Sequence, residues 1–242
     1  MLLAAGRGKR IGDISNGAPK VMLPLPSGRS LLAENLCNAF ATGAISRATV
    51  ITGYMAEVVD REVAAHEQRS MVATVHNPDF AVAGPVRSLW EARDLILDTD
   101  VLIANGDTFY RPEALATICA RGDDGLYLAY SAARIDEDDV KITRRPDGLL
   151  TSVGKAILPV DADGISAGLF LARGSAARQE LAAVLHRFID GGRAAERGVI
   201  WHDLVGELAT MGGGVHTIEI DPGSWQEVDT PADYDRLRTA LH

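Results

Sequence analysis

Short apolar runs alternate with stretches of helical periodicity over the first 130 residues of the chain. Between residues 30 and 42, apolar side chains recur every three or four positions, which is the spacing of one buried helix face. The run from Ala48 to Thr52 is short and rich in β-branched residues, as in a buried strand. By these criteria we expect strands at residues 1–5, 48–52, 72–76, 100–105 and 125–131, and helices at residues 30–42, 55–66, 88–97 and 112–120. This alternation predicts a mostly parallel sheet with helices on both faces.

The pattern changes after residue 131, where strands follow one another directly. A turn at Pro146-Asp147-Gly148 separates two of them. We expect strands at residues 140–143, 149–153, 165–172 and 215–220, and helices at residues 175–189, 201–210 and 231–241. With no internal repeat and no low-complexity linker, the simplest organisation is one α/β domain over residues 1–242, with an α+β elaboration in its second half.

The net charge excludes one class of partner. The chain has 24 Lys and Arg residues against 33 Asp and Glu residues, a formal net charge of −9. Such an acidic protein is poorly suited to a nucleic-acid backbone, so we expect no nucleic-acid partner. A small phosphorylated ligand needs only a local group of cations and stays compatible with the sequence.

Two features bear on the compartment. No run of about 18 apolar residues is present to span a membrane, and residues 1–6 are too short for a signal peptide. Cys37 and Cys119 form no CxxC pair and no cluster with histidine, which favours two buried free thiols in a reducing compartment. We therefore expect a cytoplasmic protein with no membrane partner.

A glycine-rich segment, Gly6-Arg7-Gly8-Lys9-Arg10, follows the first predicted strand. Glycines let the backbone turn sharply and bring its N–H groups close to a ligand, and Arg7, Lys9 and Arg10 add positive charge. Lys20, after Pro19, is a further cation that can fold back over this loop. Converging backbone donors and cations suit a triphosphate. The alternative is a turn with solvated basic residues; a dinucleotide fingerprint is excluded because Ile11 stands at its third glycine position.

Two acidic segments are candidates for a metal site. Asp107 follows a predicted parallel strand, at the edge of the sheet where ligands of such folds bind, although an aspartate in Asn-Gly-Asp also suits a turn. Glu227 and Asp229 face the same side of an extended segment, and Asp229 is also placed to cap the helix that follows. Mg²⁺ bridging protein and phosphates usually takes one or two carboxylates. We expect Asp233 to be structural, in the first turn of that last helix.

These motifs together resemble those of the nucleotidylyltransferases that activate sugar phosphates and phospho-alcohols. The matching segments are Leu3-Ala4-Ala5-Gly6-Arg7-Gly8-Lys9-Arg10 with Pro19-Lys20, Gly106-Asp107, and Trp225 to Asp233. The resemblance implies a Rossmann-like mixed sheet of the nucleotide-diphospho-sugar transferase type. It also implies phosphate contacts by Arg10 and Lys20, and Mg²⁺ held by Asp107 and Asp229 with support from Glu227. The nucleotide-binding positions that it implies in these motifs are Leu3, Ala4, Ala5, Gly6, Gly8 and Gly106.

Further segments resemble the cytidylyltransferase branch, whose members attach CMP to phosphocholine, inositol 1-phosphate or aminoalkyl phosphonates. Gly84 and Ser88 stand where that branch faces the cytosine, and Gly53 and Tyr54 match its Thr-Gly-Tyr near the base and acceptor. Its acceptor side is matched by Asp138-Asp139-Val140-Lys141-Ile142, Gly148 and Val153-Gly154-Lys155. The resemblance makes Lys155 the acceptor-side cation. A helix N-cap is the alternative for Ser88, and a surface lysine the alternative for Lys155. The absence of asparagine and aromatic residues at positions 83–87, with only 5% aromatic residues overall, weakens phosphocholine and leaves phosphonates, polyol phosphates and sugar phosphates open.

The expected function is Mg²⁺-dependent transfer of CMP from CTP to a small phosphonate or phospho-alcohol, with release of pyrophosphate. Residues 1–130 would form the nucleotide-binding half, and residues 131–242 the acceptor-binding half with the second metal carboxylate. One alternative is a sugar-1-phosphate nucleotidylyltransferase using UTP, dTTP or GTP. Another is a non-catalytic nucleotide-binding protein, which the joint presence of two cations and two carboxylates argues against. A homodimer through second-half elements is compatible with the sequence. The six histidines show no metal-ligand spacing and are expected to be structural or on the surface, and the three tryptophans to be packing residues.

Overall fold

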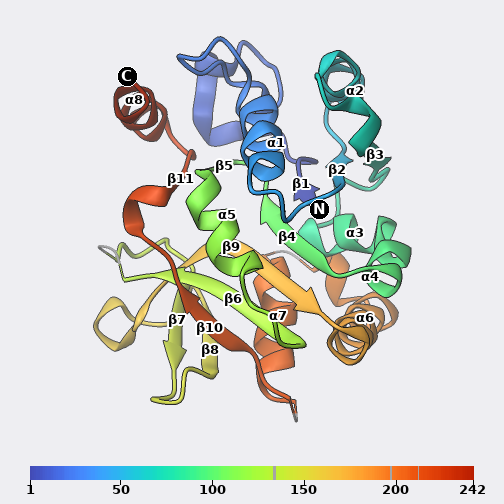
Figure 1. Ribbon diagram of the computed structural model, residues 1–242, viewed down its shortest axis with the longest axis vertical. Helices are drawn as coiled ribbons and strands as arrows, with labels where there is room; N and C mark the ends of the chain where they lie inside the picture. Colours follow the sequence, from blue (N-terminus) through green and yellow to red (C-terminus); the bar gives the residue numbers. More distant parts are fainter. Residues whose placement is uncertain (133–134, 197, 212) are drawn as a thin grey trace.

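A twisted mixed sheet forms the centre of the molecule (Figure 1). The computed structural model describes residues 1–132, 135–196, 198–211 and 213–242. Within these residues the sheet has nine strands, seven of them in the order β10-β6-β9-β4-β1-β2-β3, and β7 and β8 extend from β9 as an antiparallel hairpin. The strands are β1 (Leu2–Leu3), β2 (Ala48–Thr52), β3 (Val72–His76), β4 (Val101–Asn105), β6 (Gly125–Ser131), β7 (Lys141–Arg144), β8 (Leu150–Gly154), β9 (Gly164–Arg173) and β10 (His216–Glu219).

Most strands of this sheet run in one direction. β4, β1, β2 and β3 pair in parallel, and β10 pairs in parallel with β6. Only β9, among the seven ordered strands of the described chain, runs the other way, and it lies between β4 and β6. The expected mostly parallel mixed α/β sheet is therefore confirmed, and a strand from the second half of the chain joins the two groups of parallel strands.

Helices cover both faces of the sheet because its strands alternate their side chains between two apolar cores. In β4, Val101 and Ile103 belong to one core and Ala104 to the other. The first core lies under α3 (Pro85–Glu91), α4 (Arg93–Asp98), α6 (Ser175–Asp190) and α7 (Trp201–Ala209). The second lies under α1 (Leu31–Ala41), α2 (Ala56–Ala65) and α5 (Pro112–Cys119). Short 3-10 helices are η1 (Lys9–Ser15), η2 (Lys20–Met22), η3 (Arg69–Met71), η4 (Pro159–Asp161), η5 (Arg193–Ala195) and η6 (Pro222–Ser224).

The last helix, α8 (Pro231–Ala240), packs against η1 rather than against the sheet. Its N-terminus is closed by a capping box in which the Thr230 hydroxyl accepts the Asp233 N–H and the Asp233 carboxylate accepts the Thr230 N–H. The cap is thus Thr230 and not Asp229, which was the residue considered from the sequence. Asp233 has the structural role expected of it, and the Asp229 side chain is left for the site.

Three elements differ from the sequence expectations. The predicted helix at residues 88–97 begins earlier, at Pro85, and breaks at Ala92, where ψ is 16°. The predicted first strand is reduced to Leu2–Leu3. A small antiparallel pair was missed, formed by β5 (Thr108–Tyr110) and β11 (Trp225–Glu227). Cys37 and Cys119 are free thiols as expected, but they are half-buried rather than buried.

The register of the parallel strands sets two loops side by side. Leu3 of β1 lies opposite Asn105 of β4, and the Gly106 N–H donates to the Leu3 carbonyl at 3.0 Å. The glycine-rich loop after β1 therefore leaves the sheet beside Gly106 and Asp107, as expected for the carboxyl edge of a parallel sheet. In the described part of the chain, each helix is too short or too polar to cross a bilayer.

Candidate active site

The carboxyl edge of the sheet opens into a cavity of about 470 Å³. This volume is in the range of small-molecule sites. Its walls come from the glycine-rich loop, the segment before α3, the loop after β4, the β7–β8 hairpin, the start of α7 and the segment after β11. All but two of the predicted site residues line it: Leu3, Ala4, Ala5, Gly6, Gly8, Arg10, Lys20, Gly84, Ser88, Gly106, Asp107, Lys155, Glu227 and Asp229.

Two glycines permit the close approach of the backbone segments that frame the cavity. Gly8 has φ +62°, and a Cβ there would lie 2.7 Å from Cβ of Lys20. At Gly106 a Cβ would lie 2.3 Å from the Leu3 carbonyl oxygen. A side chain at either position would push Lys20 or Asp107 away from the cavity, so both glycines are needed for the geometry of the charged groups.

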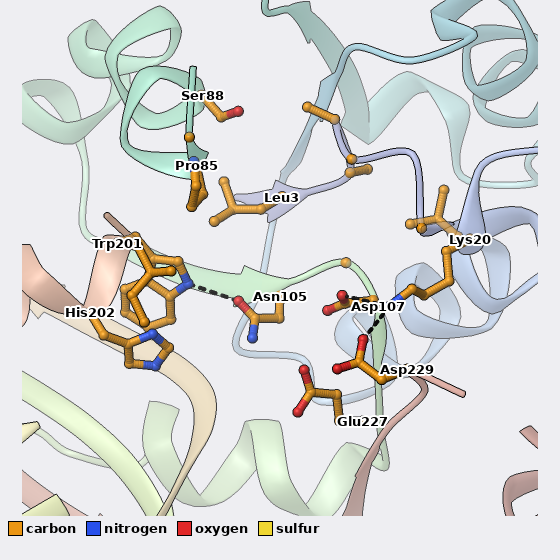
Figure 2. A pocket seen from close by; sticks show the side chains of 18 of the residues that line it. Leu3, Lys20, Pro85, Ser88, Asn105, Asp107, Trp201, His202, Glu227 and Asp229 are labelled. Carbon is orange, nitrogen blue, oxygen red and sulfur yellow. Dashed lines mark hydrogen bonds and ion pairs between the residues drawn. The ribbon is translucent and has the colours of Figure 1, made fainter. Parts of the chain in front are cut away.

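Lys20 lies at the centre of the charged groups. Its ammonium is 3.0 Å from Oδ2 of Asp107 and 2.5 Å from Oδ1 of Asp229, and its side chain is 7% exposed. The other oxygen of Asp229 pairs with Arg10 at 2.6 Å, and Arg10 also reaches Asp138 at 3.9 Å. Figure 2 shows Lys20 extending toward the two carboxylates, Asp107 from the middle of the chain and Asp229 from near its C-terminus.

The short β5–β11 pair brings the distant carboxylates together. Glu227 of β11 lies opposite Thr108 of β5, and the Val228 N–H donates to the Asp107 carbonyl at 2.9 Å. Asp107, Glu227 and Asp229 each offer one oxygen within 4.8 Å of the others. The alternation expected for Glu227 and Asp229 accounts for this, because the buried Val228 points away from the site.

Desolvation and the charges of this cluster shift two pKa values. Burial alone would lower the pKa of Lys20, but the carboxylates of Asp107 and Asp229 outweigh it, and the pKa is raised above its ordinary value. Glu227 lies in the concave cavity, where desolvation, together with the negative charges of Asp107 and Asp229, raises its pKa to about 8. Three carboxylates so close together carry an excess of negative charge that one lysine and one arginine only partly offset.

This donor set fits a hard divalent cation. Carboxylate oxygens are the ligands that Mg²⁺ prefers, and the three carboxylates face one point beside the glycine-rich loop. The raised pKa of Glu227 reflects the excess negative charge of the site, which a bound cation would neutralise. Asp107 and Asp229 would hold such an ion, with Glu227 beside them.

The end of the cavity near α3 is lined by a buried serine. Ser88 is 3% exposed and its hydroxyl accepts from Nδ2 of Asn77 at 3.0 Å. Gly84, Pro85 and Phe80 complete this end of the cavity. The N-cap of α3 is Gly84, so Ser88 lies inside the helix and is not the helix cap that was its alternative.

Gly53 and Tyr54 do not line the cavity. A Cβ at Gly53 would lie 2.6 Å from Cβ of Phe80, so the glycine gives room to a cavity residue. The Tyr54 hydroxyl donates to the Gly17 carbonyl at 3.1 Å, and the Arg7 guanidinium lies 5.1 Å from the centre of its ring. The structure therefore places Tyr54 as a support of the glycine-rich loop.

The opposite end of the cavity is polar. Lys155 is exposed at the end of the β7–β8 hairpin, near Asp138 and Asp139 of the preceding loop. Desolvation raises the pKa of Asp139, whose carboxylate accepts the Asp136 N–H. Trp201 and His202 at the start of α7 form the wall, and the Trp201 indole N–H donates to Oδ1 of Asn105 at 2.8 Å (Figure 2).

Several lining residues were missed from the sequence: Asn77, Phe80, Asn105, Trp201 and His202. Asn105 was accessible to sequence reasoning, because it ends a parallel strand at the same edge as Asp107. Trp201 was assigned to packing and His202 to a structural or surface role, since helix periodicity does not say which helix end reaches a site. His202 is buried, and it is also part of the cavity wall.

Comparison with known proteins gives the family. Residues 1–197 match the model of the MobA-like NTP transferase domain. The chain belongs to this family. Over 246 residues it is 29% identical to CMP-5'-(3-aminopropyl)phosphonate synthase of Streptomyces rubellomurinus, in an alignment that covers 96% of this chain and 37% of that protein. The chain thus spans little more than a third of the length of this curated relative.

Solved structures show the same fold. The CTP:phosphocholine cytidylyltransferase of Streptococcus pneumoniae is 17% identical with a TM-score of 0.77, covering 100% of this chain and 97% of that one. A putative glucose-1-phosphate thymidylyltransferase of Bacillus anthracis is 16% identical with a TM-score of 0.76, covering 98% and 92%. Cytidylyl and thymidylyl transferases are equally close, so the fold confirms the family resemblance without selecting the nucleotide.

Proposed function

We propose that the protein transfers CMP from CTP to a small phosphonate or phospho-alcohol and releases pyrophosphate, in a reaction that depends on Mg²⁺. The observation that carries the proposal is the convergence of Lys20, Arg10 and three carboxylates beside a glycine-rich loop. A site for binding a nucleotide alone has no need of a carboxylate cluster, which repels the phosphates unless a cation joins them. The relative that makes a CMP-phosphonate supports the choice of CTP and of a phosphonate acceptor.

In the proposed reaction an anionic oxygen of the acceptor attacks the α-phosphorus of CTP. The new bond joins this oxygen to the α-phosphorus, and the bond from the α-phosphorus to the bridging oxygen breaks. Pyrophosphate leaves with that electron pair. The nucleophile is already an anion, so no general base is required, and the main barrier is the repulsion between two anions.

The chain's own residues address this repulsion. Backbone N–H groups of the glycine-rich loop would cradle the phosphates, and Lys20 and Arg10 offer positive charge where the leaving pyrophosphate gains negative charge. Lys155 lies on the acceptor side, where its ammonium offsets the charge of the incoming phosphonate or phosphate. A Mg²⁺ ion held by Asp107, Asp229 and Glu227 would supply Lewis-acid stabilisation of the α-phosphate and orient the reacting oxygens.

Ser88 and Asn77 support a base site at the end of the cavity away from Lys155. The nucleotide would then extend along the glycine-rich loop from Ser88 to Asp107, and the acceptor would approach from the side of Lys155. The two free thiols favour the cytoplasm as the compartment of the reaction.

The test is pyrophosphate release with Mg²⁺ across CTP, UTP, dTTP, GTP and ATP, each with phosphocholine, 2-aminoethylphosphonate, 2-hydroxyethylphosphonate, inositol 1-phosphate and glucose 1-phosphate. Release with CTP and a phosphonate or phospho-alcohol is the expected result. Release only with glucose 1-phosphate and another nucleotide would establish the sugar-phosphate alternative. Nucleotide binding without release for any pair would support a non-catalytic nucleotide-binding protein.

A further inference from the structure

One ring nitrogen of His202, Nδ1, makes no hydrogen bond within the described chain. The residue is 4% exposed and lies in the cavity wall on the acceptor side. Its Nε2 is 2.8 Å from the hydroxyl of Ser166, while Nδ1 makes no hydrogen bond within the described residues. Nδ1 is accessible to solvent, and because His202 lines the cavity, this nitrogen opens onto it.

The hydrogen bonds of Ser166 favour one of the two tautomers of the His202 ring. The Ser166 oxygen accepts the Gly168 N–H at 3.1 Å, and within the described residues its own hydrogen has one acceptor in reach, Nε2 of His202. A hydroxyl that donates to Nε2 requires that nitrogen to be unprotonated. The neutral ring then bears its hydrogen on Nδ1, so that a donor faces the cavity.

The ring is held both in orientation and in its neutral form. It stacks on Trp201 with 3.8 Å between ring centres. Burial, together with the smaller effect of the positive charge of Lys155, lowers the pKa of His202 to about 3. At neutral pH the imidazole is therefore uncharged and offers one fixed N–H.

A second donor lies on the same wall. The Trp201 indole N–H donates to Oδ1 of Asn105, so the Nδ2 amino group of that amide is the part left to bind another group. Nδ2 makes no hydrogen bond within the described residues, and Asn105 lines the cavity. In Figure 2 Asn105, Trp201 and His202 lie together, facing the carboxylates across the cavity. With the Lys155 ammonium, this wall offers donors, while Asp107, Glu227 and Asp229 offer acceptors.

We propose that His202 is an acceptor-binding residue whose Nδ1–H donates to an oxygen of the phosphonate or phosphate group of the acceptor. The inference rests on the proposed function and adds how the acceptor is held. A wall of donors recognises an anionic, oxygen-rich group. A neutral imidazole keeps its proton beside such a group, so it binds the acceptor without protonating the oxygen that attacks.

Two substitutions separate this role from a structural one. In His202→Gln the side-chain amide reaches the position of Nε2, which keeps the bond to Ser166 but removes the cavity donor. In His202→Asn the shorter amide reaches the position of Nδ1, which keeps a cavity donor and gives up the bond to Ser166. With CTP and an acceptor that the wild type uses, H202Q should lower kcat/KM for the acceptor about tenfold or more, leave KM for CTP within about twofold, and be more impaired than H202N.

Equal loss in H202Q and H202N, equal effects on CTP and acceptor, or no loss in H202Q would overturn the proposal. A thermal melt of each variant checks that the fold is intact.

A second measurement does not depend on turnover. In protein carrying ¹⁵N-labelled histidine, the His202 ring is assigned by its absence in H202Q. The expected spectrum has the proton on Nδ1, and methylphosphonate added with Mg²⁺ and α,β-methylene-CTP should shift that nitrogen. A proton on Nε2, or no shift, would contradict the proposal. If the wild type turns over no acceptor, the proposed function fails, and the methylphosphonate shift still decides whether His202 binds this class of anion.

Discussion

Lys20 and Asp229, which are 209 residues apart in the chain, form an ion pair of 2.5 Å within the carboxylate cluster. Asp107 completes the contact from the other side at 3.0 Å. The same three residues are those to which the proposed reaction assigns the phosphates and the metal. In the metal-free protein, the lysine therefore offsets the negative charge that a metal ion would otherwise neutralise.

The first prediction concerns this ion pair. Lys20→Met removes a cation from between two carboxylates, and the free energy of unfolding of the metal-free protein should fall by about 2 kcal/mol. This is below the ~3–5 kcal/mol of a fully buried pair, because the carboxylates keep some contact with water. Thermal melts measure the effect, and Mg²⁺ should recover part of the loss. The exposed Lys155→Met is the control for removing a lysine from the same cavity and should leave Tm unchanged; equal melting of both variants would show that Lys20 does not stabilise the cluster.

The second prediction concerns the metal. Asp107→Asn keeps the size of the side chain and removes its charge, so the fold should be retained while kcat falls on the order of 100-fold or more. Isothermal titration with Mg²⁺ in the presence of CTP should show weaker binding to the variant. Near-normal turnover in Asp107→Asn would mean that this carboxylate does not serve the metal.

The third prediction concerns pH. The ordinary carboxyl pKa of 4.5 is raised to about 8 at Glu227 in the folded, metal-free protein. Between these values the folded state holds a proton that the unfolded state releases, so stability falls as pH rises through this window. Glu227→Gln carries no charge at any pH. Its Tm should match that of the wild type near pH 4.5 and exceed it increasingly up to about pH 8.

The exposed Glu67 gives the reference for removing one carboxylate from the surface. In Glu67→Gln the difference in Tm from the wild type should change little with pH. A difference for Glu227→Gln that is equally constant, or one that favours the wild type at high pH, would contradict the electrostatic account of the cluster.

The fourth prediction compares two glycines of the site. Gly106→Ala places a methyl group against the Leu3 carbonyl and should destabilise the protein by about 3 kcal/mol or more. At Gly6 a Cβ meets nothing within 4 Å, so Gly6→Ala should melt like the wild type. It should nevertheless raise KM for CTP about tenfold, because the methyl group keeps the phosphates away from the loop backbone. Unchanged KM in Gly6→Ala would separate this loop from the nucleotide.

The sequence was most informative where the chemistry is local. Buried runs such as Ala48–Thr52 gave strands with correct ends, and Pro112 gave a helix start, because apolar period and proline geometry act over a few residues. The β5–β11 pair was not predicted, because strands of three residues are too short to show a repeating pattern of apolar and polar positions. Their pairing is decided by contacts between Thr108 and Glu227, which are far apart in the chain.

In the site, too, residues in local motifs were predicted and residues defined by distant contacts were not. The charged residues were identified because each lies in a short motif, and the structure brings them to one cavity. His202 was not identified, and for Asn105 only its place at the sheet edge was accessible, since the role of each depends on which of its atoms are already hydrogen-bonded. Within the described chain, Trp201 bonds to the amide oxygen of Asn105 and Ser166 bonds to Nε2 of His202, which leaves one nitrogen of each side chain without a partner. No local sequence pattern records these contacts, because the partners lie far apart in the chain.

The central claim is that an acceptor oxygen displaces pyrophosphate from CTP at this site. The most direct measurement uses a phosphonate acceptor labelled with ¹⁸O on phosphorus, incubated with CTP, Mg²⁺ and the protein, with the products followed by ³¹P NMR and mass spectrometry. The account predicts a CMP–phosphonate anhydride that keeps every labelled oxygen, including the bridging one, together with unlabelled pyrophosphate. Label in the pyrophosphate, or CMP released without any anhydride, would contradict it.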